Sequence, residues 1–147
     1  MSTVSTQSER LRLAVNGFDF DALALGAEKG DLVLFLHGFP QFGNVWAPVM
    51  QAVAAAGFRA VAVDQRGYSP GARPTALQDY STSQLVSDAL GFADALGARL
   101  FHLAAHDWGG YVAWKAAAEN PERVLSLSVL SMPHPNAFVD SLANDDD

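Results

Sequence analysis

The sequence predicts an α/β fold with a mostly parallel sheet, an antiparallel hairpin at its N-terminal end, and helices on both faces. Short apolar runs typical of buried strands alternate with segments of helical spacing, as in successive βαβ units. The first two strand-like segments instead alternate apolar and polar residues around Asn16-Gly17, which signals a hairpin turn. Half of the 147 residues are hydrophobic, which is enough for one soluble domain with a core.

The first half of the chain should form the hairpin, two further strands and one helix. The hairpin is expected over residues 10–25, and Leu32–Leu36 follows as a continuous apolar run, as in a strand buried on both faces. A strand is also expected at Arg59–Val63. Between these two strands, residues 46–56 have helical spacing and Gly57 follows as a stop. The inward face of this helix should carry Trp46, Val49, Met50 and Val53.

The second half should continue the alternation of helices and strands. A helix is expected to begin at Ser81, which forms a capping box with Gln84, and to run to about Leu96. The segments that follow are a strand over residues 99–105, a helix from Gly110 to about Asn120, a strand over Val124–Leu130 and a helical segment over 137–147.

The junction after the strand at 99–105 is the most informative stretch. It reads Ala105-His106-Asp107-Trp108-Gly109, with small residues two positions before and after a central acid. This spacing is that of a nucleophile elbow, a sharp strand-to-helix turn that lifts one side chain out of the sheet. A carboxylate in that place can attack carbon by displacement and leave an ester on the enzyme. The alternative for Asp107 is an ordinary carboxylate that caps the following helix.

Three motifs, each at the end of an expected strand, together resemble the α/β-hydrolase fold. More narrowly, they are similar to its branch of epoxide hydrolases and haloalkane dehalogenases, whose nucleophile is an aspartate. The motifs are His37-Gly38-Phe39-Pro40, Asp64-Gln65-Arg66-Gly67-Tyr68-Ser69 and His106-Asp107-Trp108-Gly109-Gly110.

The resemblance covers about residues 10–136 and implies a strand order of 1-2-4-3-5-6. Residues 1–136 would be the N-terminal part of an α/β-hydrolase core, and residues 137–147 the start of an incomplete cap region. The resemblance also implies the site: Asp107 as nucleophile, with the backbone N–H groups of Phe39 and Trp108 as the oxyanion hole. The substrate pocket would include Trp108, Phe39, Pro40 and His134.

The implied activity is hydrolysis of a small apolar epoxide to a diol through an alkyl-enzyme ester on Asp107. A haloalkane or haloacid dehalogenase that uses the same aspartate is the first alternative. Haloalkane dehalogenases usually carry Asn where this chain has Phe39, and fluoroacetate dehalogenases commonly carry Arg where it has Trp108, so an epoxide hydrolase is favoured. The second alternative is a catalytically inert fragment that acts as an interaction partner of a second chain.

The resemblance also indicates what this chain lacks. The histidine base, its acid and the cap tyrosines that protonate the epoxide oxygen would all follow residue 147. We therefore expect that activity needs a C-terminal half, possibly present as a second chain. Alone, Val124–Leu130 would be an apolar and unprotected edge strand, so the isolated chain should be prone to aggregation.

The remaining polar residues of the motifs are expected to be structural. His37 should hold the oxyanion loop by hydrogen bonds, His106 should point away from the pocket, and His102 should be a satisfied core residue. In the loop after Arg59–Val63, Asp64 and Arg66 should anchor their own loop by a salt bridge or backbone hydrogen bonds, and Tyr68 should pack within it.

Composition excludes several other functions. The net charge is −7 and no Lys/Arg cluster occurs, so nucleic acid is not an expected partner. No apolar run is long enough to span a membrane, and the expected location is the cytoplasm. The absence of cysteine and the dispersed histidines predict no metal site, and no cofactor is implied. The acidic end, Asp145 to Asp147, should be a solvated loop rather than a cation site.

Overall fold

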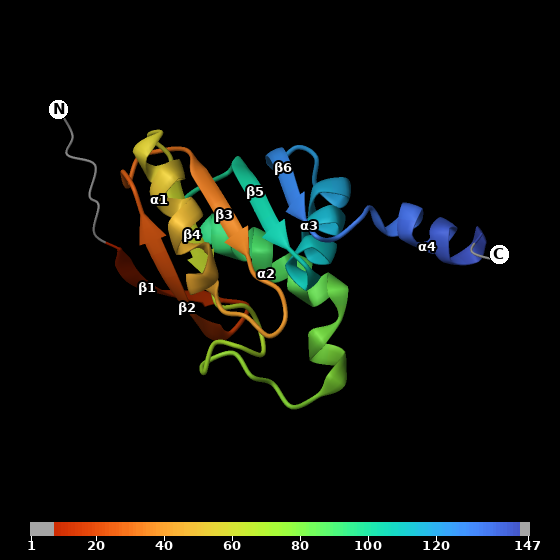
Figure 1. Cartoon of the computed structure of the whole chain (residues 1–147). Coiled ribbons are helices and arrows are strands. Elements are labelled where there is room, and N and C mark those ends of the chain that lie inside the picture. The colour runs from red at the N-terminus through yellow and green to blue at the C-terminus, as the bar shows by residue number, and fades with distance from the viewer. Residues whose placement is uncertain (1–7, 145–147) are drawn as a thin grey trace.

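The computed structural model describes residues 8–144 and has the predicted α/β fold (Figure 1). Residues 1–7 and 145–147, which include the acidic end, lie outside the described residues. Six strands form one sheet in the order β1-β2-β4-β3-β5-β6, as the resemblance implied. The strands are β1 (Glu9–Val15), β2 (Phe18–Leu25), β3 (Leu32–Leu36), β4 (Arg59–Val63), β5 (Phe101–His106) and β6 (Val124–Leu130).

The strand pairing divides the sheet into an antiparallel and a parallel part. β2 pairs antiparallel with both β1 and β4, whereas β3 pairs parallel with β4 and β5, and β5 with β6. The β1–β2 turn places Asn16 and Gly17 in the left-handed region, with φ of 51° and 81°, as a two-residue hairpin turn requires. The four parallel strands end at the same edge of the sheet, so the loops that follow them meet there.

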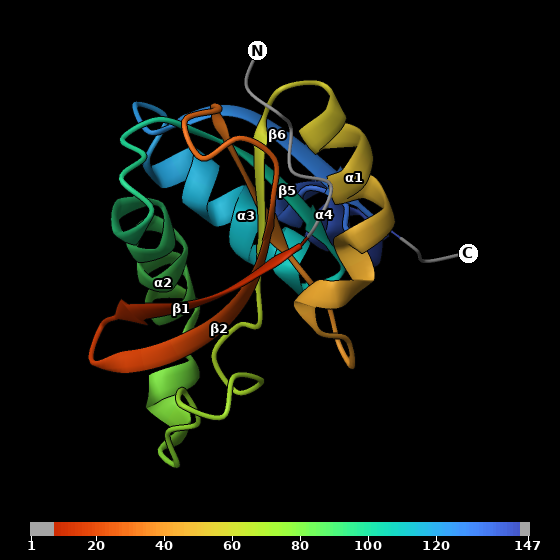
Figure 2. The same ribbon diagram turned by 90° about the vertical axis from the view of Figure 1, so that its left-hand side faces the viewer.

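Helices cover both faces of the sheet, and Figure 2 shows the sheet between them. α1 (Ala47–Ala55) follows the short 3₁₀ helix η1 (Gly43–Trp46) and lies on one face; α2 (Thr82–Ala95) and α3 (Trp108–Glu119) lie on the other. The larger apolar core fills the side of α2 and α3, where the rings of Phe20 and Phe92 meet edge to face at 4.8 Å. The smaller core lies under α1, around Phe35, Trp46 and Met50.

Several local expectations were wrong in detail. Val49 does not join the inward face of α1, because it is 47% exposed. Trp46, Met50 and Ala54, four residues apart, are buried in the core under α1, and Val53 packs against the same core. Ser81 does precede α2, but its side chain makes no capping hydrogen bond. α3 begins at Trp108, two residues earlier than expected, because the turn at Asp107 leads directly into the helix. His102 is half-buried on the α1 face of the sheet, outside both cores.

The last described helix, α4 (Pro135–Asn144), extends away from the sheet (Figure 1). None of its residues is buried, and Phe138, Val139 and Leu142 expose half or more of their surface. Over residues 8–144, no helix combines the length and the apolar character that crossing a membrane would require.

Candidate active site

Asp107 occupies a sharp turn between the end of β5 and the start of α3. Its φ and ψ are 55° and −126°, which is a strained conformation for a residue with a side chain. The turn is fixed on both sides, because the Asp107 N–H donates to the Leu130 carbonyl at 3.1 Å and its carbonyl accepts the Gly110 N–H at 2.8 Å. The geometry therefore lifts the Asp107 side chain above the edge where the parallel strands end.

Small residues around Asp107 are a steric requirement. A Cβ on Gly109 would lie 2.5 Å from the His37 carbonyl oxygen and 2.7 Å from that of Leu36, and neither backbone atom has room to move. A Cβ on Gly38 would lie 2.5 Å from the Cβ of Asp107. The two glycines therefore allow the loop after β3 to pass directly beside the β5–α3 turn.

The Asp107 carboxylate accepts a backbone hydrogen bond from the loop after β3. Its Oδ1 accepts the Phe39 N–H at 3.0 Å, and no side-chain capping hydrogen bond closes onto the first turn of α3. The Trp108 N–H, and to a smaller extent the Phe39 N–H, stabilises the charged carboxylate. Together they hold the pKa of Asp107 below its ordinary value. Amides so placed can also stabilise negative charge that develops on the same oxygen during a reaction.

His37 lies directly below this loop and is fully buried. Its Nδ1 lies 3.0 Å from the Gly38 carbonyl oxygen, and its Nε2 accepts the backbone N–H of Gln65 at 3.0 Å. Burial lowers the pKa of His37, which favours the neutral ring. The ring of Tyr68 packs edge to face on it at 4.5 Å.

A cavity of about 220 Å³ opens beside the elbow, between the loop after β4 and the first turns of α2 and α3. All three tyrosines of the chain line it. Burial is the main cause of a raised pKa of the Tyr68 hydroxyl, and the nearby charge of Asp107 raises it further. The lining residues are His37, Gly38, Gln65, Arg66, Tyr68, Tyr80, Thr82, Leu85, Trp108, Gly109, Tyr111 and Val112.

The structure brings some of the expected site residues together and separates others. Asp107, Phe39 and Trp108 share the elbow, with 68% of Phe39 and 62% of Trp108 exposed. Trp108 also lines the cavity, but Phe39 and Pro40 do not. His134 does not line the cavity either. Its ring packs edge to face on Trp114, with the ring centroids 5.0 Å apart, and its Nδ1 accepts the Asn136 N–H.

Asp64 and Arg66 hold their loop through different partners and not through each other. Asp64 Oδ1 accepts the Gly43 N–H at 2.7 Å. Arg66 forms a two-point ion pair with Asp88 of α2, with both N···O distances at 2.7 Å, and its third nitrogen donates to the Asp79 carbonyl. Sequence reasoning did not identify Asp88 as the partner, because 22 residues and an irregular loop separate the two.

Three other site residues were not anticipated from the sequence: Gln65, Tyr80 and Tyr111. Gln65 contacts His37, which lies 28 residues earlier, through both its backbone and its side chain. Tyr80 and Tyr111 reach the cavity from the segment before α2 and from α3. No local spacing links these positions, so only the packing of the elements reveals them.

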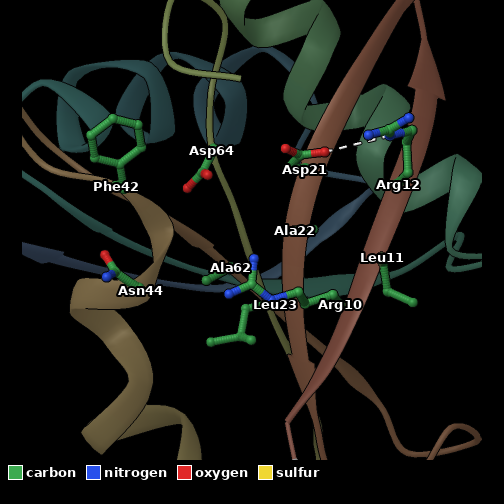
Figure 3. A pocket seen from close by; sticks show the side chains of 10 residues that line it. All are labelled: Arg10, Leu11, Arg12, Asp21, Ala22, Leu23, Phe42, Asn44, Ala62 and Asp64. Atoms are coloured by element: carbon green, nitrogen blue, oxygen red, sulfur yellow. Dashed lines mark ion pairs between the residues drawn. The ribbon is translucent and has the colours of Figure 1, made fainter. Parts of the chain in front are cut away.

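A larger hollow of about 690 Å³ lies away from the elbow, between the N-terminal hairpin and η1 (Figure 3). Arg12 and Asp21 pair across its rim at 3.5 Å, while Phe42 and Asn44 stand on the opposite side. Its charged groups are largely exposed, and one of them, Asp64, already bonds Gly43. We therefore identify the elbow, and not this hollow, as the candidate active site.

The other two histidines are occupied elsewhere. His106 lies within hydrogen-bond distance of Gln41 through Nδ1 (3.1 Å), and His102 of Ser126 (2.7 Å); neither lines the cavity. Among residues 8–144, no three His, Asp or Glu side chains are grouped so that they could hold a metal ion.

Comparison with known proteins identifies the family of this fold. The profile of the family described as alpha/beta hydrolase fold matches residues 31–146. The chain is 37% identical to human epoxide hydrolase 4 over 130 residues, and 35% identical to epoxide hydrolase A of Mycobacterium tuberculosis over 126 residues. These matches cover 88% and 86% of this chain, but only 36% and 39% of the relatives.

Solved structures give the same result. An epoxide hydrolase from Vigna radiata superposes with a TM-score of 0.81 at 34% identity, over 95% of this chain and 47% of that one. Epoxide hydrolase A from Mycobacterium thermoresistibile superposes with a TM-score of 0.82 at 30% identity, over 95% of this chain and 46% of that one. The chain thus spans less than half the length of the proteins it matches.

Proposed function

Because this chain belongs to the α/β-hydrolase fold family, we propose that it is the nucleophile-bearing part of an epoxide hydrolase. The relatives named as epoxide hydrolases support the reaction class. The observation that carries the proposal is Asp107 itself, a carboxylate raised on a strained turn with the Phe39 amide 3.0 Å from one of its oxygens. The substrate would be a small apolar epoxide, and the cytoplasmic location stays a prediction.

The proposed reaction has two steps. An oxygen of Asp107 forms a bond to one epoxide carbon while the ring C–O bond breaks, and the released oxygen takes up a proton to become a hydroxyl. Water then adds to the carbonyl carbon of the resulting ester. The N–H groups of Phe39 and Trp108 would stabilise the oxyanion until the diol leaves and the carboxylate is restored.

The second step needs a base that none of the four histidines can supply. Both ring nitrogens of His37 are engaged by Gly38 and Gln65, and the other three histidines do not line the cavity. We propose that the base, its orienting acid and the proton donors for the epoxide oxygen come from a C-terminal half. The relatives support this only by their length, since this chain covers 36% and 39% of them. The 147-residue chain by itself should therefore form the ester, with water protonating the released oxygen, but should not hydrolyse it.

Denaturing intact-mass spectrometry tests this proposal. The chain incubated with a small reactive epoxide should gain the mass of one epoxide, and peptide mapping should locate it at Asp107. The Asp107→Asn variant should gain nothing, because an amide is not a nucleophile. Addition elsewhere, or equally in both proteins, would contradict the assigned nucleophile.

The same assay separates the two alternatives. A dehalogenase would be alkylated at Asp107 by a haloalkane with release of halide, while epoxides leave it unchanged. The feature that favours a haloalkane substrate is the exposed indole of Trp108 beside Asp107, because its N–H could donate to the leaving halide. An inert interaction fragment would react with neither class of reagent.

A further inference from the structure

We propose that Gln65 is a positioning residue, which acts through His37 to aim the Phe39 N–H at Asp107. This inference rests on the proposed function, because its catalytic value depends on Asp107 as the nucleophile. Gln65 lies in the loop after β4, beside the start of the oxyanion loop at His37 but far from it in sequence. The chain of contacts from Gln65 to Asp107 has three steps.

The first step fixes the protonation of His37. A backbone N–H is a donor only, so the Nε2 that faces Gln65 N at 3.0 Å must be an unprotonated acceptor. A carbonyl oxygen is an acceptor only, so the Nδ1 that faces Gly38 O at 3.0 Å must carry the proton. The partners of His37 therefore select one neutral tautomer, with the proton on Nδ1.

The second step fixes the backbone of His37. The Gln65 side-chain amide donates to the His37 carbonyl oxygen at 2.6 Å. The same oxygen faces Gly109, where an added Cβ would approach to 2.5 Å. Gln65 thus holds His37 at two points, and the same oxygen lies against the α3 backbone at Gly109, where a side chain would not fit.

The third step transmits this position to Phe39. The Gly38 carbonyl accepts hydrogen bonds from His37 Nδ1 and from the Gln41 N–H at 2.9 Å. In a trans peptide the C=O and the N–H point in opposite directions, and the Gly38–Phe39 bond is trans. Fixing the Gly38 oxygen on one side therefore aims the Phe39 N–H to the other side, where Asp107 Oδ1 lies at 3.0 Å.

Hydrogen exchange of the Phe39 amide is the direct test, because it does not require activity. The Gln65→Met variant keeps the length of the side chain and the backbone N–H but removes the amide donor. We expect the protection of the Phe39 amide to fall about tenfold, which corresponds to the net free energy of one hydrogen bond. The protection of the core amide of Leu34 should stay unchanged. The matched control is Gln51→Met, at an exposed position on α1.

Reaction with the epoxide provides a second readout. In the Gln65→Met variant, ester formation at Asp107 should slow about tenfold through lost orientation. The acid limb of its pH profile should also move to higher pH, because the Phe39 N–H no longer favours the charged carboxylate. The Gln65→Glu variant should be slower still, since an ionised carboxylate repels the His37 carbonyl oxygen.

The outcomes distinguish this inference from the proposed function. Unchanged protection of Phe39 in Gln65→Met, or a loss shared equally by Phe39 and Leu34, would overturn the positioning role. Should the variants fail to fold, nitrogen NMR of wild-type His37 decides, and a ring protonated on Nε2 would overturn it. A wild-type chain that no epoxide alkylates would refute the proposed function alone.

Discussion

At the scale of single residues, the neutral imidazole of His37 is the most consequential group beside Asp107. Its partners leave no acceptor for a second ring proton, because the nitrogen that would take up this proton, Nε2, already accepts the backbone N–H of Gln65. Burial lowers its pKa below the ordinary value of 6.5. An imidazolium at this position would have to break away from Gln65, and the loop after β3 would lose its support.

This arrangement predicts that acid destabilises the fold through His37. Between pH 6.5 and the lower pKa of the folded state, the unfolded chain binds a proton at His37 that the folded chain does not, so stability falls as pH falls through this range. Well above pH 6.5, His37 is neutral in both states and does not affect the pH dependence of stability. The slope of this contribution approaches about 1.4 kcal/mol per pH unit.

Urea unfolding at pH 7.5 and pH 5.5 measures the effect. The difference in unfolding free energy between the two pH values should shrink in His37→Asn and persist in His134→Gln, whose side chain is exposed. An equal difference in wild type and His37→Asn would contradict the prediction.

At the scale of elements, the two-point ion pair of Arg66 and Asp88 fastens the loop after β4 to α2. Both side chains are nearly inaccessible, at 2% and 3% exposure, and Asn16 from the hairpin also donates to Asp88. Three segments that are distant in the sequence therefore meet at one carboxylate. This contact orients the segment that carries Gln65 and Tyr68 at the candidate site.

Removal of one partner should be costly, because it leaves a buried charge without compensation. We expect Asp88→Ala to lower the free energy of unfolding by about 3–5 kcal/mol, and the double variant Arg66→Met/Asp88→Leu to recover much of that loss. The exposed pair Lys115–Glu119 provides the control, since replacing Glu119 by Ala should cost far less than Asp88→Ala. Chemical denaturation of the four proteins checks this, and a double variant no better than Asp88→Ala would contradict it.

At the scale of the whole molecule, β6 is an edge strand with exposed apolar side chains. Leu125 is 51% exposed and Leu130 is 50% exposed, and the α1 face beside β6 carries a further hollow lined by Val49, Val53 and Phe58. An unpaired edge of this kind is a template for added strands. In the proposed enzyme, a C-terminal half would cover it.

The 147-residue chain in isolation is therefore expected to self-associate through β6. Light scattering coupled to size exclusion, over a range of concentrations, should show species larger than the monomer. The Leu125→Lys variant should form fewer of these species, because it places a charge on β6. The control variant Leu77→Lys should form as many as the wild type, because it adds the same charge away from β6, at an 87% exposed site on the 3₁₀ helix η2 (Leu77–Tyr80). A wild-type chain that remains monomeric at all concentrations would contradict this expectation.

Most of the architecture could be predicted because its signals are local. The alternation around Asn16-Gly17, the apolar runs and the small residues beside Asp107 each depend on neighbours along the chain. The six strands and the hairpin were therefore correctly predicted, and their order followed from the resemblance. Details that depend on the fit between elements, such as the outward position of Val49 and the half-buried position of His102, were not correctly predicted.

By itself, the sequence determined the fold class, the place of the elbow and the identity of its raised residue, because turn geometry and side-chain chemistry are properties of a few adjacent residues. Only the tertiary structure decided what holds the loops that meet at Asp107. Gln65 reaches His37 across 28 residues, and Asp88 reaches Arg66 across 22. Such contacts exist only after the parallel strands bring their loops to one edge, and the pattern of residues along the chain carries no signal for them.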